Sequence, residues 1–211
     1  LFRGEEFHAK AIKPTTIKGC PICLRADAAA SDRPAAEAMA IRGHWLPTPA
    51  MLCLEHSHPL VPLWTAADPY ERHDVVAQFR GIADAVLNGE LDQPLREPRA
   101  YDLWLEARLI GHCGDGWLDQ FALYPAAHFC QLLGRAFFTL KIPKTRPMKP
   151  EQSWMTFDFG YRFASKGEGA IRKALMELQE EAESPGAGPK AIFGEWAMDL
   201  PVIVPIVIGL T

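Results

Sequence analysis

The segment Cys20-Pro-Ile-Cys23, matched further along the chain by Cys53-Leu-Glu-His56, decides how the first part of this protein folds. Each segment holds two metal-ligating side chains with two residues between them, so one tight turn can direct both toward a single ion. Three thiolates and one neutral imidazole fill all four positions of tetrahedral zinc. We therefore predict one structural Zn²⁺ ion, with no open position for water or substrate.

Two other histidines compete for the fourth position of this site. His58 could replace His56, because a Cys-x4-His spacing also fits a tetrahedron, and His44 is a weaker competitor. A redox Cys-x-x-Cys pair or unrelated free thiols would leave the second pair at matching spacing unexplained. The pattern therefore favours zinc held by Cys20, Cys23, Cys53 and His56.

The remaining cysteines give a weaker indication of a second site. Cys113 follows His112, and Cys130 lies two residues after His128. Cys130 falls on the apolar side of a predicted helix, where cysteine usually serves as a small buried hydrophobe. We therefore favour a packing role for it.

The composition is that of a soluble globular protein in a reducing compartment. The chain has 211 residues, of which 48% are hydrophobic and 23% charged. No run approaches the roughly 20 apolar residues of a membrane-spanning helix. Five cysteines, an odd number, favour metal ligation over a disulfide framework. Because the chain begins at Leu1 and not at methionine, we expect it to be a fragment of a longer protein.

The charge is distributed unevenly. A formal net charge of -4 argues against nucleic-acid binding through the whole surface. Bases outnumber acids between residues 135 and 173, which allows either a solvated face or a surface that contacts phosphates. The candidate nucleic-acid contacts in this stretch are Arg135, Lys141, Lys144, Arg146, Lys149, Arg162 and Lys166.

The pattern along the chain predicts a mainly α protein with a small, irregular, zinc-ribbon-like module at its N-terminus. We assign residues 1–64 to the zinc module, 65–200 to a helical region, and 201–211 to an apolar tail. The helical region is expected to be a bundle with helix-turn-helix-like hairpins, although most such pairs only pack the core.

Local signals place the expected helices. Asp68-Pro69 predicts a helix start and Asn88-Gly89 its end. A second helix is expected over 101–112, with Tyr101, Leu105 and Leu109 inward, ended by the turn at 114–116.

Three further helical signals follow. A short turn is expected from Trp117, and a helix restarts at Tyr124-Pro125 and closes at Gly134. Residues 139–150 are expected to form a loop. Ser165 and Glu168 predict a capping box that opens a last helix. The buried face of that helix is expected to comprise Ile171, Ala174, Leu175, Leu178 and Ala182.

Several of these segments resemble the TniQ family of transposon target-selection proteins. The resemblance is carried by the runs 19–27 (GCPICLRAD), 42–47 (RGHWLP), 53–56 (CLEH) and 59–61 (PLV), and more weakly by 117–119, 132–134, 160–178 and 188–194. It covers most of the chain. In that family a CPxCL motif is followed by an arginine and tryptophan segment and a CxxHxxxL knuckle.

The resemblance implies a non-enzymatic, DNA-associated adaptor of the bacterial cytoplasm and nucleoid. Such a protein binds DNA or a guide complex and recruits transposition proteins such as an ATPase regulator. By residue, the resemblance carries over only the zinc ligands. In the family a helical segment with a helix-turn-helix precedes the zinc module, whereas this sequence starts at Leu1, and we expect that segment to be missing from it.

Two other function classes remain open at this point. A zinc-stabilised interaction module could dock a protein partner through apolar faces that include Phe137, Phe138 and Trp154, without touching DNA. An enzyme is disfavoured, because a closed zinc site offers no open coordination position and the sequence holds no paired carboxylates or phosphate-binding loop. The oligomeric state is not indicated by any feature of the sequence.

Overall fold

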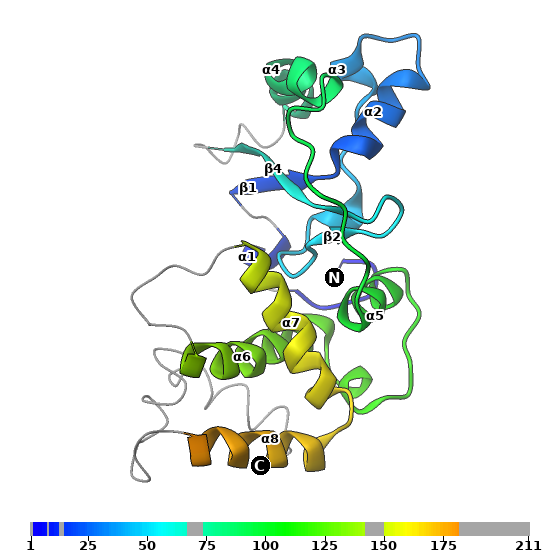
Figure 1. The fold of residues 1–211 in the computed structure, drawn as a ribbon. Helices are drawn as coiled ribbons and strands as arrows, with labels where there is room; N and C mark the ends of the chain where they lie inside the picture. The colour runs from blue at the N-terminus through cyan, green and yellow to red at the C-terminus, as the bar shows by residue number, and fades with distance from the viewer. Residues whose placement is uncertain (1, 8, 13–14, 67–73, 142–149, 182–211) are drawn as a thin grey trace. The chain divides into compact units, whose positions relative to one another are not determined.

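In the computed structural model the chain is mainly helical, with two small two-stranded sheets near the N-terminus (Figure 1). This confirms the expected fold class at that level. The structure describes residues 2–7, 9–12, 15–66, 74–141 and 150–181. The chain divides into two compact units, which we call the metal unit, His8–Pro98, and the helical unit, Leu1–Phe7 with Arg99–Thr211. The predicted boundary at residue 64 lies inside the metal unit, and the predicted apolar tail lies outside the described residues.

The metal unit is built from a series of helices, turns and strands, and the helical unit from helices and turns. The metal unit contains α1 (Ala9–Ile12), β1 (Thr16–Gly19), α2 (Pro21–Ala29), α3 (Ala35–Ala38), the 3-10 turn η1 (Gly43–Trp45), β2 (Leu52–Cys53), β3 (His58–Pro59), β4 (Val61–Thr65) and α4 (Val75–Leu87). The helical unit contains α5 (Ala100–Leu109), the 3-10 turn η2 (Trp117–Gln120), α6 (Leu123–Lys141), α7 (Pro150–Ala164) and α8 (Glu168–Glu181).

The core of the metal unit forms around two antiparallel strand pairs. β1 pairs with β4, with Ile17 opposite Trp64, and β2 pairs with β3 as a hairpin. The Trp64 ring meets Phe79 of α4 edge to face, with ring centroids 5.3 Å apart. Trp45 is fully buried. These aromatic side chains supply apolar area that the short strands could not bury alone.

Helix α4 starts later than the sequence signal predicts. Its first residue is Val75, and the Asp74 carboxylate accepts a hydrogen bond from the Ala77 amide at 3.0 Å. The predicted start at Asp68-Pro69 lies outside the described residues. The predicted end is confirmed, because the helix closes at Asn88 and Gly89 takes the left-handed φ of 75° that favours glycine.

Helix α5 buries the predicted face but ends earlier than predicted. Tyr101, Leu105 and Leu109 are all buried. The helix stops at Leu109 because Gly111, with φ 89°, provides the left-handed turn. The expected stop at residues 114–116 is therefore wrong. The predicted short turn from Trp117 is confirmed as η2.

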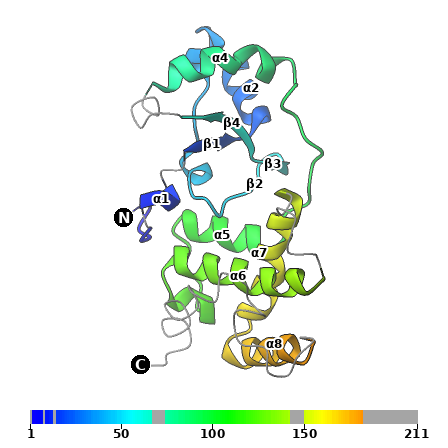
Figure 2. The same cartoon turned by 90° about the vertical axis from the view of Figure 1, so that its left-hand side faces the viewer.

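Helix α6 does not close at Gly134 as predicted but continues to Lys141. Helix α6 packs across α7 (Figures 1 and 2), and Gly134 lies at the contact between the two backbones. A Cβ atom on Gly134 would lie 1.8 Å from the Thr156 carbonyl oxygen, and one on Gly160 would lie 1.9 Å from the Cys130 carbonyl oxygen. The two backbones approach so closely that only glycine fits at either position.

Helix α7 was not predicted, although its start at Pro150 matches the proline preference for the first helical turn. It also changes how the next helix begins. Ser165 donates its backbone N–H to Tyr161 and so closes α7, and Gly167 with φ 86° separates the two helices. The predicted Ser165–Glu168 capping box is therefore wrong.

The buried face of α8 is as predicted at Ile171, Ala174 and Leu178. Leu175 is half-buried, and Ala182 lies outside the described residues. Among the helices that the structure describes, none is both long and apolar enough to cross a membrane.

Within the helical unit, a buried polar network joins the start of the chain to α5, η2 and α6. The Arg108 guanidinium is 4% exposed and lies 2.6 Å from Glu5 and 3.2 Å from Asp119. Glu5 also accepts the Leu123 amide at 2.9 Å, and Asp119 accepts the Trp104 indole N–H at 2.8 Å. Each buried charge in this network is therefore paired, which is the condition under which buried ions are tolerated.

Candidate metal centre

The first ligand pair lies at the junction of β1 and α2. Cys20 directly precedes α2 in an extended conformation, and Pro21 occupies the first turn, so Cys23 follows one turn later. Gly19 brings the strand close to the core: a Cβ there would lie 2.7 Å from Leu63 and 3.1 Å from Trp45. The N-terminus of a helix also favours negative charge, which suits two thiolates.

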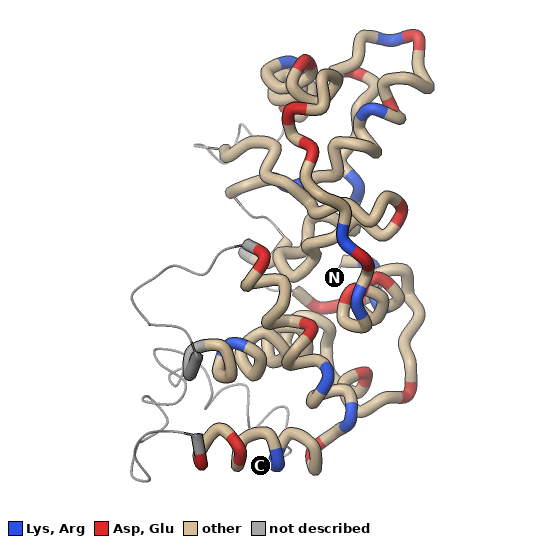
Figure 3. The backbone as a smooth tube through the Cα atoms, in the orientation of Figure 1, with Lys and Arg blue, Asp and Glu red and all other residues tan. Residues whose placement is uncertain are grey.

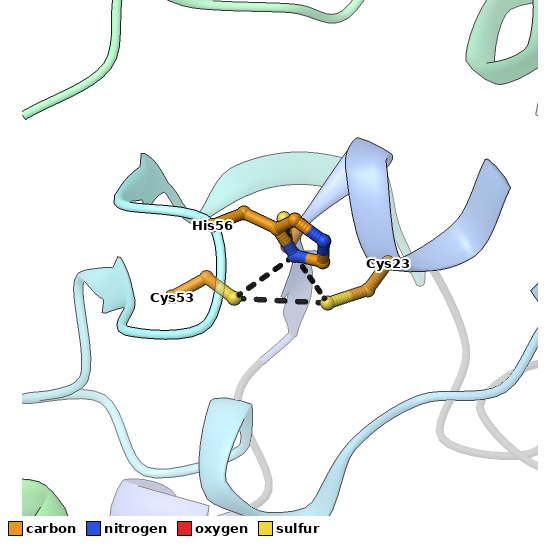
Figure 4. Close-up of side chains that lie close together, drawn as sticks. Cys23, Cys53 and His56 are labelled. Atoms are coloured by element: carbon orange, nitrogen blue, oxygen red, sulfur yellow. Dashed lines mark hydrogen bonds between the residues drawn. The ribbon is translucent and has the colours of Figure 1, made fainter. Parts of the chain in front are cut away.

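The second ligand pair lies on the β2–β3 hairpin. Cys53 ends β2 and pairs across the hairpin with His58, and His56 lies in the turn between them. Ser57 completes the turn with a left-handed φ of 51°. The strand pairing thus places Cys53 and His56 on one knuckle facing the start of α2 (Figure 4).

The four candidate ligand atoms all lie within 4.8 Å of one another. The Cys23 and Cys53 sulfurs are 3.6 Å apart, and His56 Nδ1 lies 3.9, 3.2 and 3.8 Å from the sulfurs of Cys20, Cys23 and Cys53. Metal–ligand bonds of about 2.3 Å to sulfur and about 2.0 Å to nitrogen give tetrahedral edges of about 3.8 Å and about 3.5 Å. The observed spacing therefore fits one four-coordinate ion, and it far exceeds the roughly 2.05 Å of a disulfide.

The crowded thiols do not hold their protons independently. The hydrogen bond with Cys23 lowers the pKa of Cys20, but the hydrogen bond with Cys53 and burial outweigh it and raise that pKa to about 11. Hydrogen bonds with Cys20 and Cys53 raise the pKa of Cys23 well above its usual range, and hydrogen bonds from Cys20 and Cys23 depress that of Cys53. Deprotonation of all three thiols would place three negative charges side by side, an arrangement that a bound cation would stabilise.

The two competing histidines do not join the four ligands. His58 is 1% exposed, and its Nδ1 lies 2.6 Å from the Pro59 carbonyl oxygen while its Nε2 accepts the Gln93 amide at 2.9 Å. Both ring nitrogens are therefore engaged, so His58 cannot replace His56. His44 lies against the Trp45 ring at 5.8 Å between centroids.

The described residues contain one cluster of His, Cys, Asp or Glu side chains suited to a metal, the one above. Cys130 is fully buried in α6, which confirms its interpretation as a small hydrophobe, and burial raises the pKa of its thiol. Cys113 is exposed.

Two further side chains support the ligand-bearing elements, and sequence reasoning had given them no role. Arg42 binds Asp27 of α2 with two hydrogen bonds of 2.9 and 2.5 Å and lies 5.6 Å from the Trp45 ring centroid. Lys18 donates to the carbonyl oxygens of Thr48 and Ala50 at 3.1 and 2.5 Å. The signal for Arg42 and Asp27 was present, because both lie in the segments that carry the family resemblance.

Of the seven candidate nucleic-acid contacts, three have side chains that the structure describes. Arg135 is half-buried in α6, and Arg162 lies 2.9 Å from Asp158 on α7. Lys166 is exposed after α7. Lys141 ends α6, and Lys144, Arg146 and Lys149 lie outside the described residues. Acidic and basic positions are interspersed along α7 and α8 (Figure 3).

Comparison of this chain with protein-family models, with curated proteins and with solved structures gave no match.

Proposed function

We propose that Cys20, Cys23, Cys53 and His56 bind one structural Zn²⁺ ion. The tetrahedral spacing of three sulfurs and one nitrogen carries this proposal. Zinc favours this donor set and this geometry, and thiolate ligands disfavour magnesium, calcium and manganese. Four protein ligands leave no position for substrate, so the ion stabilises the fold and performs no chemistry.

The test is metal content and geometry in the purified full chain. We expect about one zinc per chain and, after replacement with Co²⁺, the intense visible absorption of a tetrahedral thiolate site. A Cys23→Ala variant should lose both signals, whereas Cys113→Ala, which removes an exposed cysteine, should lose neither. An octahedral Co²⁺ spectrum or a zinc content unchanged by Cys23→Ala would refute the assignment.

For the protein as a whole we propose a non-enzymatic, DNA-associated adaptor of the TniQ type, acting at the bacterial nucleoid. It would help select the target of DNA transposition by binding DNA or a guide complex and recruiting a transposition ATPase. The support is the family resemblance together with the closed donor set. Two of the runs that carry the family resemblance, residues 19–27 and 42–47, are also joined in the metal unit, because Arg42 donates to Asp27. We expect such a contact in a motif that builds one small module.

The same proposal includes a specific architecture for each unit. The metal unit would be a zinc-ribbon-like module, with one knuckle from the hairpin and the other from the first turn of α2. Helices α5 and α6 would form a helix-turn-helix-like pair through η2. Lys166 and Arg162 are the candidate phosphate contacts among the described residues, and Arg162 would have to exchange its Asp158 partner for phosphate.

The alternative is a zinc-stabilised protein-interaction module. One observation favours it: two large apolar side chains, Leu103 of α5 and Ile110, which directly follows that helix, are 55% and 53% exposed. The docking faces predicted from Phe137 and Trp154 are not available, because these side chains are only 9% and 7% exposed. Phe138 is half-buried and meets Phe159 edge to face.

A salt series separates the two functions. DNA binding by the zinc-loaded chain should weaken linearly in a log–log plot against salt, because phosphate contacts release counterions. The double variant Arg162→Gln/Lys166→Gln should reduce the slope by up to about 2, at roughly 0.9 for each lost contact. The matched control, Arg33→Gln in the metal unit, removes an exposed charge and should leave the slope unchanged. No DNA binding at low salt with zinc present would favour the interaction module.

A further inference from the structure

The segment of residues 92–98, which we call the connector, leads from the metal unit to the helical unit and contains no helix or strand. Three polar contacts nevertheless hold it within the metal unit. Asp92 binds Arg25 with two hydrogen bonds of 2.8 and 2.7 Å. The Gln93 amide donates to His58 Nε2 at 2.9 Å, and the Arg96 amide donates to the Ser57 carbonyl oxygen at 2.7 Å.

The acceptors for Gln93 and Arg96 both belong to the hairpin that carries two metal ligands. Ser57 and His58 directly follow His56, and His58 is the strand partner of Cys53. The His58 ring is fixed in one tautomer, because Nδ1 donates to Pro59 and leaves Nε2 as the acceptor. The positions of both acceptors therefore depend on the turn that Cys53 and His56 close.

The other contact reaches the connector from the other ligand-bearing element. Arg25 lies on α2, two residues after Cys23, and its guanidinium donates to the Val86 carbonyl oxygen at 2.9 Å as well as to Asp92. It thereby joins α2 to the end of α4 and to the first residue of the connector. The two elements that one metal ion would hold together are thus the two elements that hold the connector.

We propose that the metal centre is also a clasp for the connector, so that bound metal fixes residues 92–96 and loss of the metal frees them. This inference rests on the proposed zinc site. Beyond Arg96, the Arg99 amide donates to the Asp102 carboxylate at 3.0 Å in the helical unit. Only Glu97 and Pro98 lie between these two anchored amides.

The clasp changes the largest distance that the free part of the connector can span. At about 3.3–3.6 Å for each extended residue, Glu97 and Pro98 span roughly 7 Å, whereas a released connector of residues 92–98 spans roughly 24 Å. Pro94 and Pro98 limit the backbone freedom of the bound segment further. An adaptor that recruits one partner while holding another needs a link of fixed length between its two units. Here the bound metal would fix that length.

The test measures amide hydrogen exchange at Gln93 and Arg96 in the full, zinc-loaded chain by NMR. Both amides should be protected. His58→Phe fills the buried site without an acceptor, and it should accelerate exchange at Gln93 by at least about tenfold while zinc stays at one per chain. His58→Gln, which restores an acceptor oxygen, should recover part of the protection.

A second variant guards against failure of the buried substitution to fold. Asp92→Ala changes a side chain that is 40% exposed and removes only the Arg25 pair, so the zinc site should form normally. We expect exchange at Gln93 to rise severalfold. Removal of zinc with a chelator should abolish protection at both amides.

Three results would overturn the clasp. These are unprotected Gln93 and Arg96 amides in the zinc-loaded chain, protection that persists after zinc is removed, and wild-type exchange in both zinc-loaded variants. A chain that holds no zinc and still protects Gln93 refutes the clasp together with the zinc proposal. A chain that binds zinc, protects Gln93 and fails to bind DNA refutes only the DNA role.

Discussion

The metal unit and the helical unit bring distant parts of the chain together in different ways. In the described part of the metal unit the longest strand is Val61–Thr65, and the candidate ligands come from segments about thirty residues apart that meet around one site. In the helical unit α6 and α7 are long enough to bury continuous faces, and they cross at Gly134 and Gly160 with the backbones nearly in contact.

From this difference we infer which interactions stabilise each unit. With the proposed ion bound, the metal unit would rely on a few strong bonds to that ion, because its elements are short. The helical unit relies on many weak contacts, such as the stacked rings of Phe137 and Phe163 at 5.3 Å. A single perturbation should therefore damage one unit and spare the other.

Removal of the metal should have the largest effect. Structural zinc sites contribute about 10–16 kcal/mol of binding free energy, which is comparable with the stability of a whole domain. We expect a chelator, or the Cys20→Ala/Cys53→Ala double variant, to unfold the metal unit. NMR signals of the Trp45 and Trp64 indoles should lose dispersion, while those of Trp104 and Trp154 persist. Simultaneous loss of all four signals would show that the units are not independent.

Disruption of the buried ion network should rank next and act on the helical unit. Arg108→Met leaves the carboxylates of Glu5 and Asp119 without their cation, at a cost of about 3–5 kcal/mol. Urea unfolding followed at α5 and α6 would measure the loss. Arg172→Met is the matched control: its pair with Glu168 is 70% and 48% exposed, so its removal should cost less than about 0.5 kcal/mol. Equal effects of the two substitutions would argue against the network.

The glycine crossing should give an intermediate effect. Gly160→Ala places a methyl group against the backbone of α6, and overpacking of this kind costs about 1–3 kcal/mol or more. Thermal unfolding should show a lower midpoint for the helical unit with unchanged zinc content. Gly169→Ala in α8 meets nothing within 4 Å and should be neutral or slightly stabilising. A neutral Gly160→Ala would mean that the helices separate at no cost.

The smallest effect is expected from a glycine in the metal unit. Gly81 lies inside α4, where a Cβ would meet nothing within 4 Å, so Gly81→Ala should stabilise the zinc-loaded unit by about 0.5–1 kcal/mol. Denaturant unfolding with and without zinc would measure it. The gain should not rescue the zinc-free unit, since it is far smaller than the metal contribution. A metal unit that folds without zinc in this variant would break the comparison between the two units.

Local patterns in the sequence predicted some elements well and others poorly. Asn88-Gly89 ends α4 as predicted, because a left-handed glycine stops a helix wherever it occurs. The same rule failed at Gly134. This glycine lies inside α6, where its missing side chain lets the backbone of α7 approach, and it does not form a turn. The Ser165–Glu168 signal failed as well, since Ser165 closes α7 before α8 begins.

The sequence by itself identified the four residues that the structure brings together as a candidate metal site, because each pair lies within one short turn whose geometry depends only on local spacing. It also determined the buried faces of α5 and α8, since the 3.6-residue period is a property of the helix alone. Only the tertiary structure decided the rest. The roles of Gly160, of Arg108 with Glu5, and of His58 with Gln93 each depend on segments far apart in the chain, whose approach no local pattern encodes.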